Sequence, residues 1–261
     1  MFRGLLVVLL HVVLVPVFAV TGIVINLFAP RLEMIPLLGK WWGAAIVTAG
    51  GIRVRVSGLA HVRDTRPAVV VGNHTSHLDT YLFAKLIPRP IRVVAKASLF
   101  KIPFMGQAMR AAGAVPVHRT GDAGDIDRVD RLRSELREGA RLVFFPEGTR
   151  SRDGRLRRFK KGAFVTAIQE QVPIVPMVII GAHLRHPADS IRFYPGEVEV
   201  HFLEPVPTRG MVIADRDRLI ETVWKLFREQ LPLDQKPLPR HRAEASEDRG
   251  RNGADAPCPP L

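Results

Sequence analysis

The chain has 261 residues, a length that suits one domain with short appendages, and 47% of them are hydrophobic. Its 38 Lys and Arg side chains outnumber 25 Asp and Glu, and the resulting net charge of +13 predicts an anionic partner such as a nucleic acid, an anionic membrane or a phosphorylated ligand. The single cysteine, Cys258, excludes an intrachain disulfide and argues against a cysteine-based metal site or nucleophile.

The N-terminal region is dominated by two apolar stretches. The first, residues 4–29, exceeds the ~20 apolar residues that a membrane-spanning helix needs. A cleaved signal peptide is the alternative, but its apolar region has only roughly 7–15 residues. The second stretch, residues 34–49, carries Trp41 and Trp42 beside Lys40, which suits either a membrane interface or an ordinary buried helix. We therefore expect residues 1–50 to form a membrane anchor of one helix or a helix pair.

From residue 51 the pattern is that of an α/β domain. Short apolar or alternating runs predict strands at 52–56, 68–71, 92–95, 115–117, 142–145, 174–180 and 197–202. Helical spacing predicts helices at 79–87, 125–138, 159–171 and 211–230. This alternation indicates a mainly parallel sheet flanked by helices. Residues 232–261 are rich in proline and charge without apolar periodicity, which predicts a disordered tail.

The loop after the 68–71 strand contains the first candidate site, Asn73-His74-Thr75-Ser76-His77-Leu78-Asp79. Loops at the carboxyl ends of parallel strands are the usual place for a site in such sheets. His74 is a candidate general base, because histidine is the side chain that most often takes up a proton in catalysis, and a carboxylate such as Asp79 can orient it if Asp79 lies in the first turn of the next helix. Two alternatives remain: Asp79 is only the last residue of a capping box that begins at Ser76, or His77 is the base.

The loop after the 142–145 strand contains the second candidate site, Phe145-Pro146-Glu147-Gly148-Thr149-Arg150-Ser151. Glycine permits close approach of the backbone to a ligand, and arginine binds phosphate through paired hydrogen bonds. Residues 150–161 hold seven cationic side chains and one carboxylate, a net charge of +6. A solvated loop is the alternative, but the position beside the candidate site favours binding of an anionic head group or membrane surface.

Two further segments are less informative alone. Residues 113–119 form a short strand that ends at Arg119, which by itself is an ordinary surface arginine. The segment Val172-Pro173-Ile174-Val175-Pro176 has two prolines, which favour an edge strand or a strand start, with a structural role or a surface for an acyl chain. Signatures of serine hydrolases, zinc proteases, nucleotide kinases and Rossmann oxidoreductases are absent from the sequence.

Taken in order, these four blocks resemble the glycerophospholipid acyltransferase family, particularly bacterial 1-acyl-glycerol-3-phosphate acyltransferases. The family's His-x4-Asp block matches His74 and Asp79, and its Gly-to-Arg block matches Gly113 and Arg119. Its Phe-Pro-Glu-Gly-Thr-Arg-Ser and Val-Pro-Ile-Val-Pro blocks match residues 145–151 and 172–176 throughout. Two positions differ: His118 replaces an acidic residue, and the segment Ala95-Lys96-Ala97-Ser98-Leu99 lacks the family's glutamate.

The resemblance implies a reaction and a site. His74 removes the proton from the sn-2 hydroxyl of the acceptor, Asp79 orients His74, and the alkoxide attacks the thioester of acyl-CoA or acyl-carrier protein. The acceptor is held by six residues, of which the arginines and Lys96 bind its phosphate: Lys96, Arg119, Glu147, Gly148, Thr149 and Arg150. No metal or cofactor is expected.

The resemblance also implies domains and partners. Residues 51–231 are the acyltransferase domain, and 232–261 remain the disordered tail. Expected partners are anionic membrane lipids, a lysophospholipid and the acyl donor, but not a nucleic acid, since no nucleic-acid-binding signature is found. We expect an anchor in the bacterial inner membrane with the catalytic domain on the cytoplasmic side. Alternatives are an acyltransferase for another lysolipid, a lipid hydrolase or thioesterase, and a noncatalytic basic module.

Overall fold

The computed structural model describes residues 2–28, 34–103, 105–111, 114–117 and 132–238. Its centre is a seven-stranded sheet with the strand order β1-β7-β6-β2-β5-β3-β4. Neighbouring strands run parallel except β6 and β7, which are antiparallel. The expected mainly parallel sheet is therefore confirmed. The strands are β1 (Ile52–Ser57), β2 (Ala68–Gly72), β3 (Ile91–Lys96), β4 (Val115–Val117), β5 (Arg141–Phe144), β6 (Ile174–Ile180) and β7 (Gly196–Phe202).

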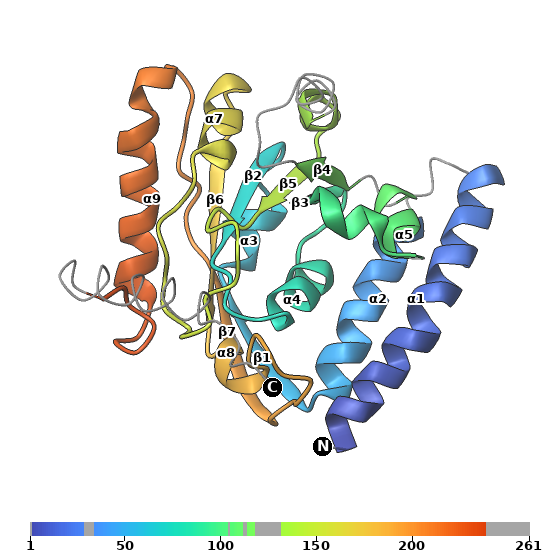
Figure 1. The fold of residues 1–261 in the computed structure, drawn as a ribbon. Helices are drawn as coiled ribbons and strands as arrows, with labels where there is room; N and C mark the ends of the chain where they lie inside the picture. Colours follow the sequence, from blue (N-terminus) through green and yellow to red (C-terminus); the bar gives the residue numbers. More distant parts are fainter. Residues whose placement is uncertain (1, 29–33, 104, 112–113, 118–131, 239–261) are drawn as a thin grey trace, which may run out of the picture.

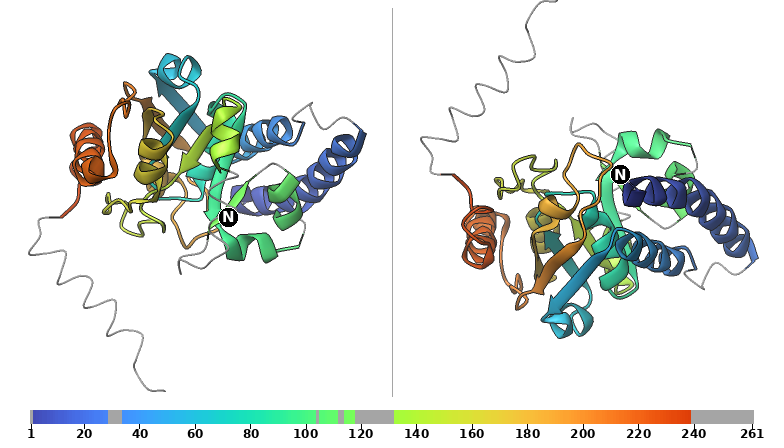
Figure 2. Two further views of the ribbon diagram at one scale, coloured as in Figure 1. Left: turned by 90° about the horizontal axis from the view of Figure 1, so that it is seen from above. Right: turned by 90° about the horizontal axis from the view of Figure 1, so that it is seen from below.

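Helices cover both faces of this sheet (Figures 1 and 2). On one face, α7 (Gly162–Gln169) and α9 (Arg216–Gln230) pack on Val69, Val71 and Val178. On the other face, α4 (Leu78–Leu86) packs on Val70 and Val175. The central strands β2 and β6 are almost wholly buried, as expected for apolar strands covered on both sides. The shorter helices are α3 (Leu59–Arg63), α5 (Met105–Ala111), α8 (Ala182–Arg185) and the 3-10 turns η2 (Ala97–Lys101) and η3 (Ile213–Asp215).

Most predicted boundaries lie within a few residues of the observed ones. The helix expected at 211–230 begins only at Arg216, after η3. The helix expected at 159–171 begins at Gly162, and the one expected at 125–138 is described only from residue 132, where it is helical to 137.

The two N-terminal helices stack outward from α4. The second, α2 (Met34–Ala49), crosses α4 so closely that a Cβ on Gly43 would lie 2.5 Å from the Tyr81 carbonyl oxygen. Ile46 and Val47 of α2 are buried, whereas Trp41 is 64% exposed. Residues 34–49 were expected either at a membrane interface or in an ordinary buried helix, and the buried inner face of α2 supports the second alternative.

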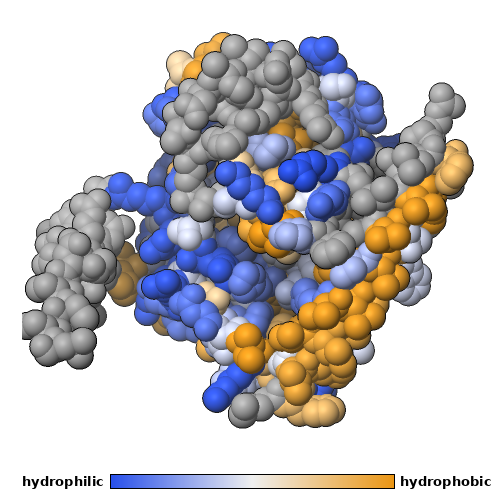
Figure 3. Space-filling view, turned by 45° about the vertical axis from the view of Figure 1, so that its right-hand side comes forward, coloured by the Kyte–Doolittle hydropathy of each residue, from blue (hydrophilic) through white to orange (hydrophobic). Residues whose placement is uncertain are grey.

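The first helix, α1 (Phe2–Phe28), packs beside α2 and α5 and is long and apolar enough to cross a membrane. Its inner side contacts the domain: Val7 is buried, and His11 Nε2 lies 3.0 Å from the Tyr81 hydroxyl. Its outer side exposes a row of large apolar residues, seen as an orange ridge in Figure 3: Phe2, Leu5, Leu9, Val13, Val17, Val20, Val24 and Phe28. Val8 and Val12 are also exposed, but they line a cavity between α1 and the domain. A continuous exposed apolar ridge of this kind marks a membrane or protein contact.

Two expectations are corrected by the structure. Pro176 lies in β6, a central strand and not an edge strand. The strand tolerates it because β7 ends at Phe202, and the Pro176 carbonyl accepts a hydrogen bond from Leu203 N beyond that end. The first residues of the tail expected to be disordered, 232–238, fold back against the domain, with Gln235 only 1% exposed.

Residues 232–238, which we call the C-terminal segment, contact the loop that follows residues 145–151. We call residues 145–151 the Glu147 turn. The Gln235 carbonyl accepts a hydrogen bond from Leu156 N at 2.9 Å, and its side-chain Oε1 accepts one from Gly181 N at 2.8 Å. Arg155 donates to the Lys236 carbonyl at 2.8 Å. These bonds satisfy backbone groups that would otherwise face only water, and they extend the ordered domain beyond residue 231. The expected tail beyond residue 238 lies outside the described residues.

Candidate active site

His74 and Asp79 form a hydrogen-bonded pair at the carboxyl end of β2. The His74 ring Nδ1 lies 2.9 Å from Asp79 Oδ2. Because a carboxylate oxygen accepts, Nδ1 carries the proton and leaves Nε2 free to receive one. The His74 side chain is 18% exposed, whereas Asp79 is fully buried. A base that reaches solvent and is oriented by a buried carboxylate is the arrangement that activates a hydroxyl group.

Asp79 both caps the start of α4 and orients His74, two roles that the sequence left as alternatives. It lies in the first turn of α4, and the same Oδ2 atom accepts hydrogen bonds from Thr75 N at 2.7 Å and Ser76 N at 2.8 Å. The carboxylate thus satisfies backbone donors at the start of the helix and orients His74 at once. His77 has no such bond to Asp79, which distinguishes the two histidines.

Neighbouring strands fix the backbone of the His74 loop. The Asn73 side chain pairs with the backbone of Ile179 in β6, with bonds of 2.8 and 2.7 Å. His74 N donates to Glu147 Oε1 at 2.8 Å, and the His74 carbonyl accepts from Ser151 N at 2.8 Å. The turn after β5 therefore holds the His74 peptide on both sides. The His74 ring also stacks on Phe145, with ring centroids 4.3 Å apart.

Glu147 lies inside the protein, in contrast to the expectation that it holds the acceptor. The residue is 3% exposed, and its second carboxylate oxygen accepts a hydrogen bond from Arg157 N at 3.3 Å. Burial raises its pKa to about 8, although the bonds from His74 and Arg157 oppose the shift. The geometry makes Glu147 a positioning residue that connects two loops of the site.

The rest of the turn faces outward. Gly148 adopts a φ of 72°, a left-handed conformation that favours glycine. Thr149 is exposed and Arg150 is half-buried, with one guanidinium nitrogen 2.6 Å from the Ala188 carbonyl. Most of the cationic side chains that follow are exposed: Arg152, Arg157, Arg158, Lys160 and Lys161. The structure thus brings Thr149 and Arg150 to the same loop cluster as His74.

The structure does not describe two of the remaining predicted site residues in full. Lys96 ends β3, and only its backbone is described; Arg119 lies outside the described residues. The segment 172–176 leads into β6, where Ile174 and Val175 are fully buried in the core. Since core side chains cannot line a substrate surface, this segment matches the structural role and not an acyl-chain surface.

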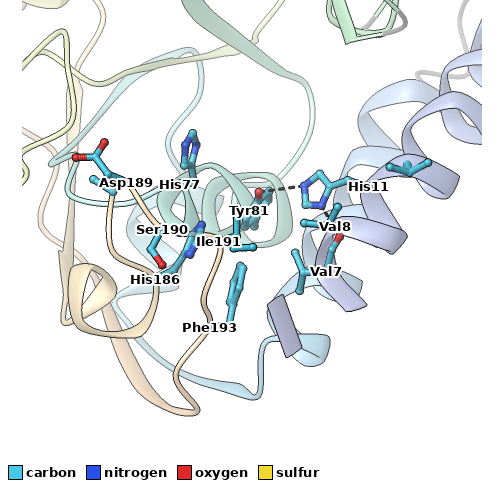
Figure 4. Close-up of a pocket in the computed structure, with 12 residues that line it drawn as sticks. Val7, Val8, His11, His77, Tyr81, His186, Asp189, Ser190, Ile191 and Phe193 are labelled. Atoms are coloured by element: carbon cyan, nitrogen blue, oxygen red, sulfur yellow. Dashed lines mark hydrogen bonds between the residues drawn. The ribbon is translucent and has the colours of Figure 1, made fainter. Parts of the chain in front are cut away.

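A cavity of about 350 Å³ lies between α1, the start of α4 and the loop 186–193 (Figure 4). Its walls are mainly apolar, with Val7, Val8 and Val12 on one side and Ile191 and Phe193 on the other. No local pattern predicts this cavity, because it forms between α1 and a loop of irregular composition that is distant in the sequence.

His77 and Tyr81 line the same cavity. Partial burial, assisted by the positive charge of Arg150, lowers the pKa of His77 to about 4, and burial raises the pKa of Tyr81 to about 12. Both are therefore uncharged at neutral pH, as an apolar ligand requires.

The comparisons with known proteins agree with this geometry. Residues 53–180 match the sequence model of the Acyltransferase family. The chain is 31% identical over 222 residues to the 1-acyl-sn-glycerol-3-phosphate acyltransferase of Limnanthes douglasii, with 83% of this chain and 78% of that one covered. The chain belongs to the 1-acyl-sn-glycerol-3-phosphate acyltransferase family.

Two further relatives agree with that assignment. The human 1-acyl-sn-glycerol-3-phosphate acyltransferase alpha is 37% identical over 185 residues, covering 69% of this chain and 65% of that one. The crystal structure of the 1-acyl-sn-glycerophosphate (LPA) acyltransferase PlsC of Thermotoga maritima superposes with a TM-score of 0.69 at 25% identity, covering 87% of this chain and 95% of that one. The chain is therefore an acyltransferase with the fold of that enzyme.

Proposed function

We propose that this acyltransferase transfers a fatty acyl group to the sn-2 hydroxyl of 1-acyl-glycerol-3-phosphate, giving phosphatidic acid for phospholipid synthesis. The donor in this proposal is a thioester, acyl-CoA or acyl-carrier protein. The proposal rests on the hydrogen-bonded pair His74–Asp79, whose histidine backbone is hydrogen-bonded to the turn that contains Arg150. The names of the relatives support the acceptor.

The proposed mechanism uses only the residues of this site. The acceptor hydroxyl gives its proton to His74 Nε2 while the oxygen attacks the thioester carbonyl. Asp79, bonded to the opposite ring nitrogen, stabilises the imidazolium that forms. The tetrahedral intermediate collapses with cleavage of the carbon–sulfur bond, and the thiolate takes the proton back from Nε2. No step needs a metal, a cofactor or a covalent enzyme intermediate.

Arg150 supplies the positive charge for the acceptor phosphate in this proposal. Its guanidinium is tethered to the loop 186–193 through the Ala188 carbonyl, so it is held beside the dyad and partly out of water. A charge held in this way interacts more strongly with a phosphate than a fully solvated one. Thr149 and the backbone of Gly148 complete the proposed contact, and Lys96 and Arg119 remain proposed contributors.

The apolar cavity is proposed to take the acyl chain of the donor. It includes His77, two residues before Asp79; its walls are mainly apolar, and His77 and Tyr81 in it are uncharged at neutral pH. A thioester carbonyl at His74 with its chain against these apolar walls brings the reacting atoms together.

We further propose that the apolar ridge of α1 lies in one leaflet of the membrane. The inner side of α1 packs on α2 and the domain, while the exposed large apolar side chains lie on its outer side. The exposed cations of residues 150–161 would then meet anionic lipid head groups. We place the protein at the bacterial inner membrane with its catalytic domain in the cytoplasm, where thioester donors are made. Digestion of right-side-out and inverted vesicles with protease tests this orientation.

Acyl transfer in reconstituted membranes tests the function. The purified protein is given one thioester donor and a panel of acceptors: 1-acyl-glycerol-3-phosphate, lyso-ornithine lipid, lysophosphatidylcholine and no acceptor. We expect product only with the first and at least a 10²-fold lower rate for His74→Ala. Acylation of another lysolipid alone would contradict the acceptor, and acceptor-independent release of fatty acid would indicate a hydrolase.

A further inference from the structure

The side chain of Lys160 crosses the Glu147 turn. Its backbone N donates to the Pro146 carbonyl at 2.8 Å, which fixes the start of the side chain beside the turn. The side chain then lies over Gly148: a Cβ placed on that glycine would be 2.9 Å from Lys160 Nζ and 3.0 Å from Cε. The Lys160 ammonium therefore reaches the backbone of the Glu147 turn, which holds His74, although Lys160 and His74 are far apart in the sequence.

The ammonium of Lys160 is exposed and has no carboxylate partner among the residues that the structure describes. The nearest acid in the sequence of the turn, Glu147, is buried beneath it and uses both oxygens for backbone hydrogen bonds. Other cations of the loop differ: Arg152 pairs with Asp189, and Arg155 binds carbonyls of the C-terminal segment. Lys160 is thus a cation held by packing and available to a ligand.

Lys161 provides an internal comparison. It is also exposed and carries the same charge, but it stands at the start of α7, where its positive charge acts on Asp217 of α9. The two adjacent lysines therefore serve different parts of the surface. Only the first extends over the turn that carries Arg150.

We propose that Lys160 is a phosphate-binding residue of the active site, which contacts the phosphate of the lysolipid acceptor together with Arg150. This inference rests on the proposed function. An ammonium is a compact charge with three donors, and Arg150 adds a planar fork, so the two groups bind different oxygens of one phosphate. Gly148 suits this arrangement because a side chain there would displace the ammonium.

Paired lysine variants test the inference. We expect Lys160→Ala to raise the KM for 1-acyl-glycerol-3-phosphate by about 10- to 100-fold, the usual weight of a charge-assisted hydrogen bond, with kcat changed less than threefold. Lys161→Ala, which removes the same charge, should stay within twofold of the wild type. Lys160→Arg should recover most of the loss. The assay uses neutral phosphatidylcholine vesicles, so that general attraction to an anionic surface does not contribute.

An acceptor without phosphate gives the second measurement. With 1-monoacylglycerol, the wild type should be slow and Lys160→Ala no slower. A Gly148→Ala variant should raise the KM for the phosphate-bearing acceptor, and that rise should shrink in the Lys160→Ala background because both changes act on one ammonium. Thermal unfolding of each variant separates this coupling from the strain of a non-glycine residue at a φ of 72°.

Equal KM values for the two lysine variants would overturn the inference and reduce Lys160 to surface charge. So would a loss of equal size with monoacylglycerol. These outcomes differ from a failure of the proposed function, in which the wild-type protein itself would not acylate 1-acyl-glycerol-3-phosphate.

Discussion

Replacing Asp79 by asparagine tests the dyad with little disturbance of the fold. The amide oxygen of asparagine can still accept from Thr75 N and Ser76 N, so the start of α4 keeps its hydrogen bonds. The same oxygen can also accept from His74 Nδ1, because all three bonds go to the one atom Oδ2, but the negative charge beside the ring is lost. The variant should therefore fold but fail to stabilise the imidazolium.

The size of the effect follows from the 2.9 Å contact between His74 and Asp79. Two unit charges about 4 Å apart interact with about 4 kcal/mol at an effective dielectric constant of ~20. Since about 1.4 kcal/mol changes a rate tenfold, loss of most of this interaction predicts a kcat lower by roughly 10²- to 10³-fold. Asp79→Ala should lose as much activity and, in addition, about 1–3 kcal/mol of folding stability for each backbone N–H left without an acceptor.

The assay combines steady-state acyl transfer in vesicles with urea unfolding of the same samples. Asp79→Asn should retain a KM for both substrates within a few-fold of the wild type, because Asp79 is fully buried and does not contact them. A folded Asp79→Asn protein that keeps more than a tenth of the wild-type kcat would refute the assigned role of the carboxylate.

Three further predictions follow from contacts described above. Burial raises the pKa of Glu147 from 4.5 to about 8, so the stability that its protonated form contributes is full below pH 4.5 and declines toward pH 8. Between these pH values, the free energy of unfolding of the wild type should fall relative to that of Glu147→Gln by up to ~1.4 kcal/mol per pH unit. Urea unfolding of both proteins at several pH values measures this difference. Gly43→Val should destabilise the protein by about 1–3 kcal/mol or separate α2 from α4, measured by thermal unfolding, since even a Cβ meets the Tyr81 carbonyl oxygen; an unchanged melting temperature would contradict this helix crossing. Val8→Phe, in the cavity wall, should change the ratio of kcat/KM for short-chain to long-chain acyl donors by about tenfold in favour of the shorter chains. Val13→Phe, on the exposed side of α1 and outside the cavity wall, should leave this ratio unchanged. Equal ratios in the two variants would show that the cavity does not take the donor chain.

The sequence predicted the sheet and the dyad because both depend on local patterns. The apolar runs at 68–71 and 174–180 can only be buried strands, and the loop after the first of them brings His74 within reach of a carboxylate five residues later. The sequence did not predict what depends on distant packing. Nothing local distinguishes a glutamate that binds a substrate from Glu147, which is buried between two loops that are joined only in the folded chain.

The same limit applies to the helices and to Pro176. Trp41 and Gly43 lie in one apolar stretch, yet one is exposed and the other touches α4, a difference set by the crossing of two helices. The two prolines predicted an edge strand or a strand start; β6 does start at Ile174, beside them, but it is a central strand, which the early end of the neighbouring strand β7 makes possible at Pro176. Composition predicted disorder from residue 232, whereas specific hydrogen bonds that Gln235 accepts from Leu156 N and Gly181 N order the first seven residues.

The contacts of Gln235 also bear on the order in which the molecule is completed during synthesis. α1 leaves the ribosome before the sheet does, whereas Leu156 and Gly181 obtain their acceptors only when the C-terminal segment has emerged. The basic loop at 150–161 can therefore form its hydrogen bonds to the C-terminal segment only at the end of synthesis of the domain, and these bonds are its support. A partner protein fused after Leu238 leaves that support in place, and one fused directly after Leu231 removes it.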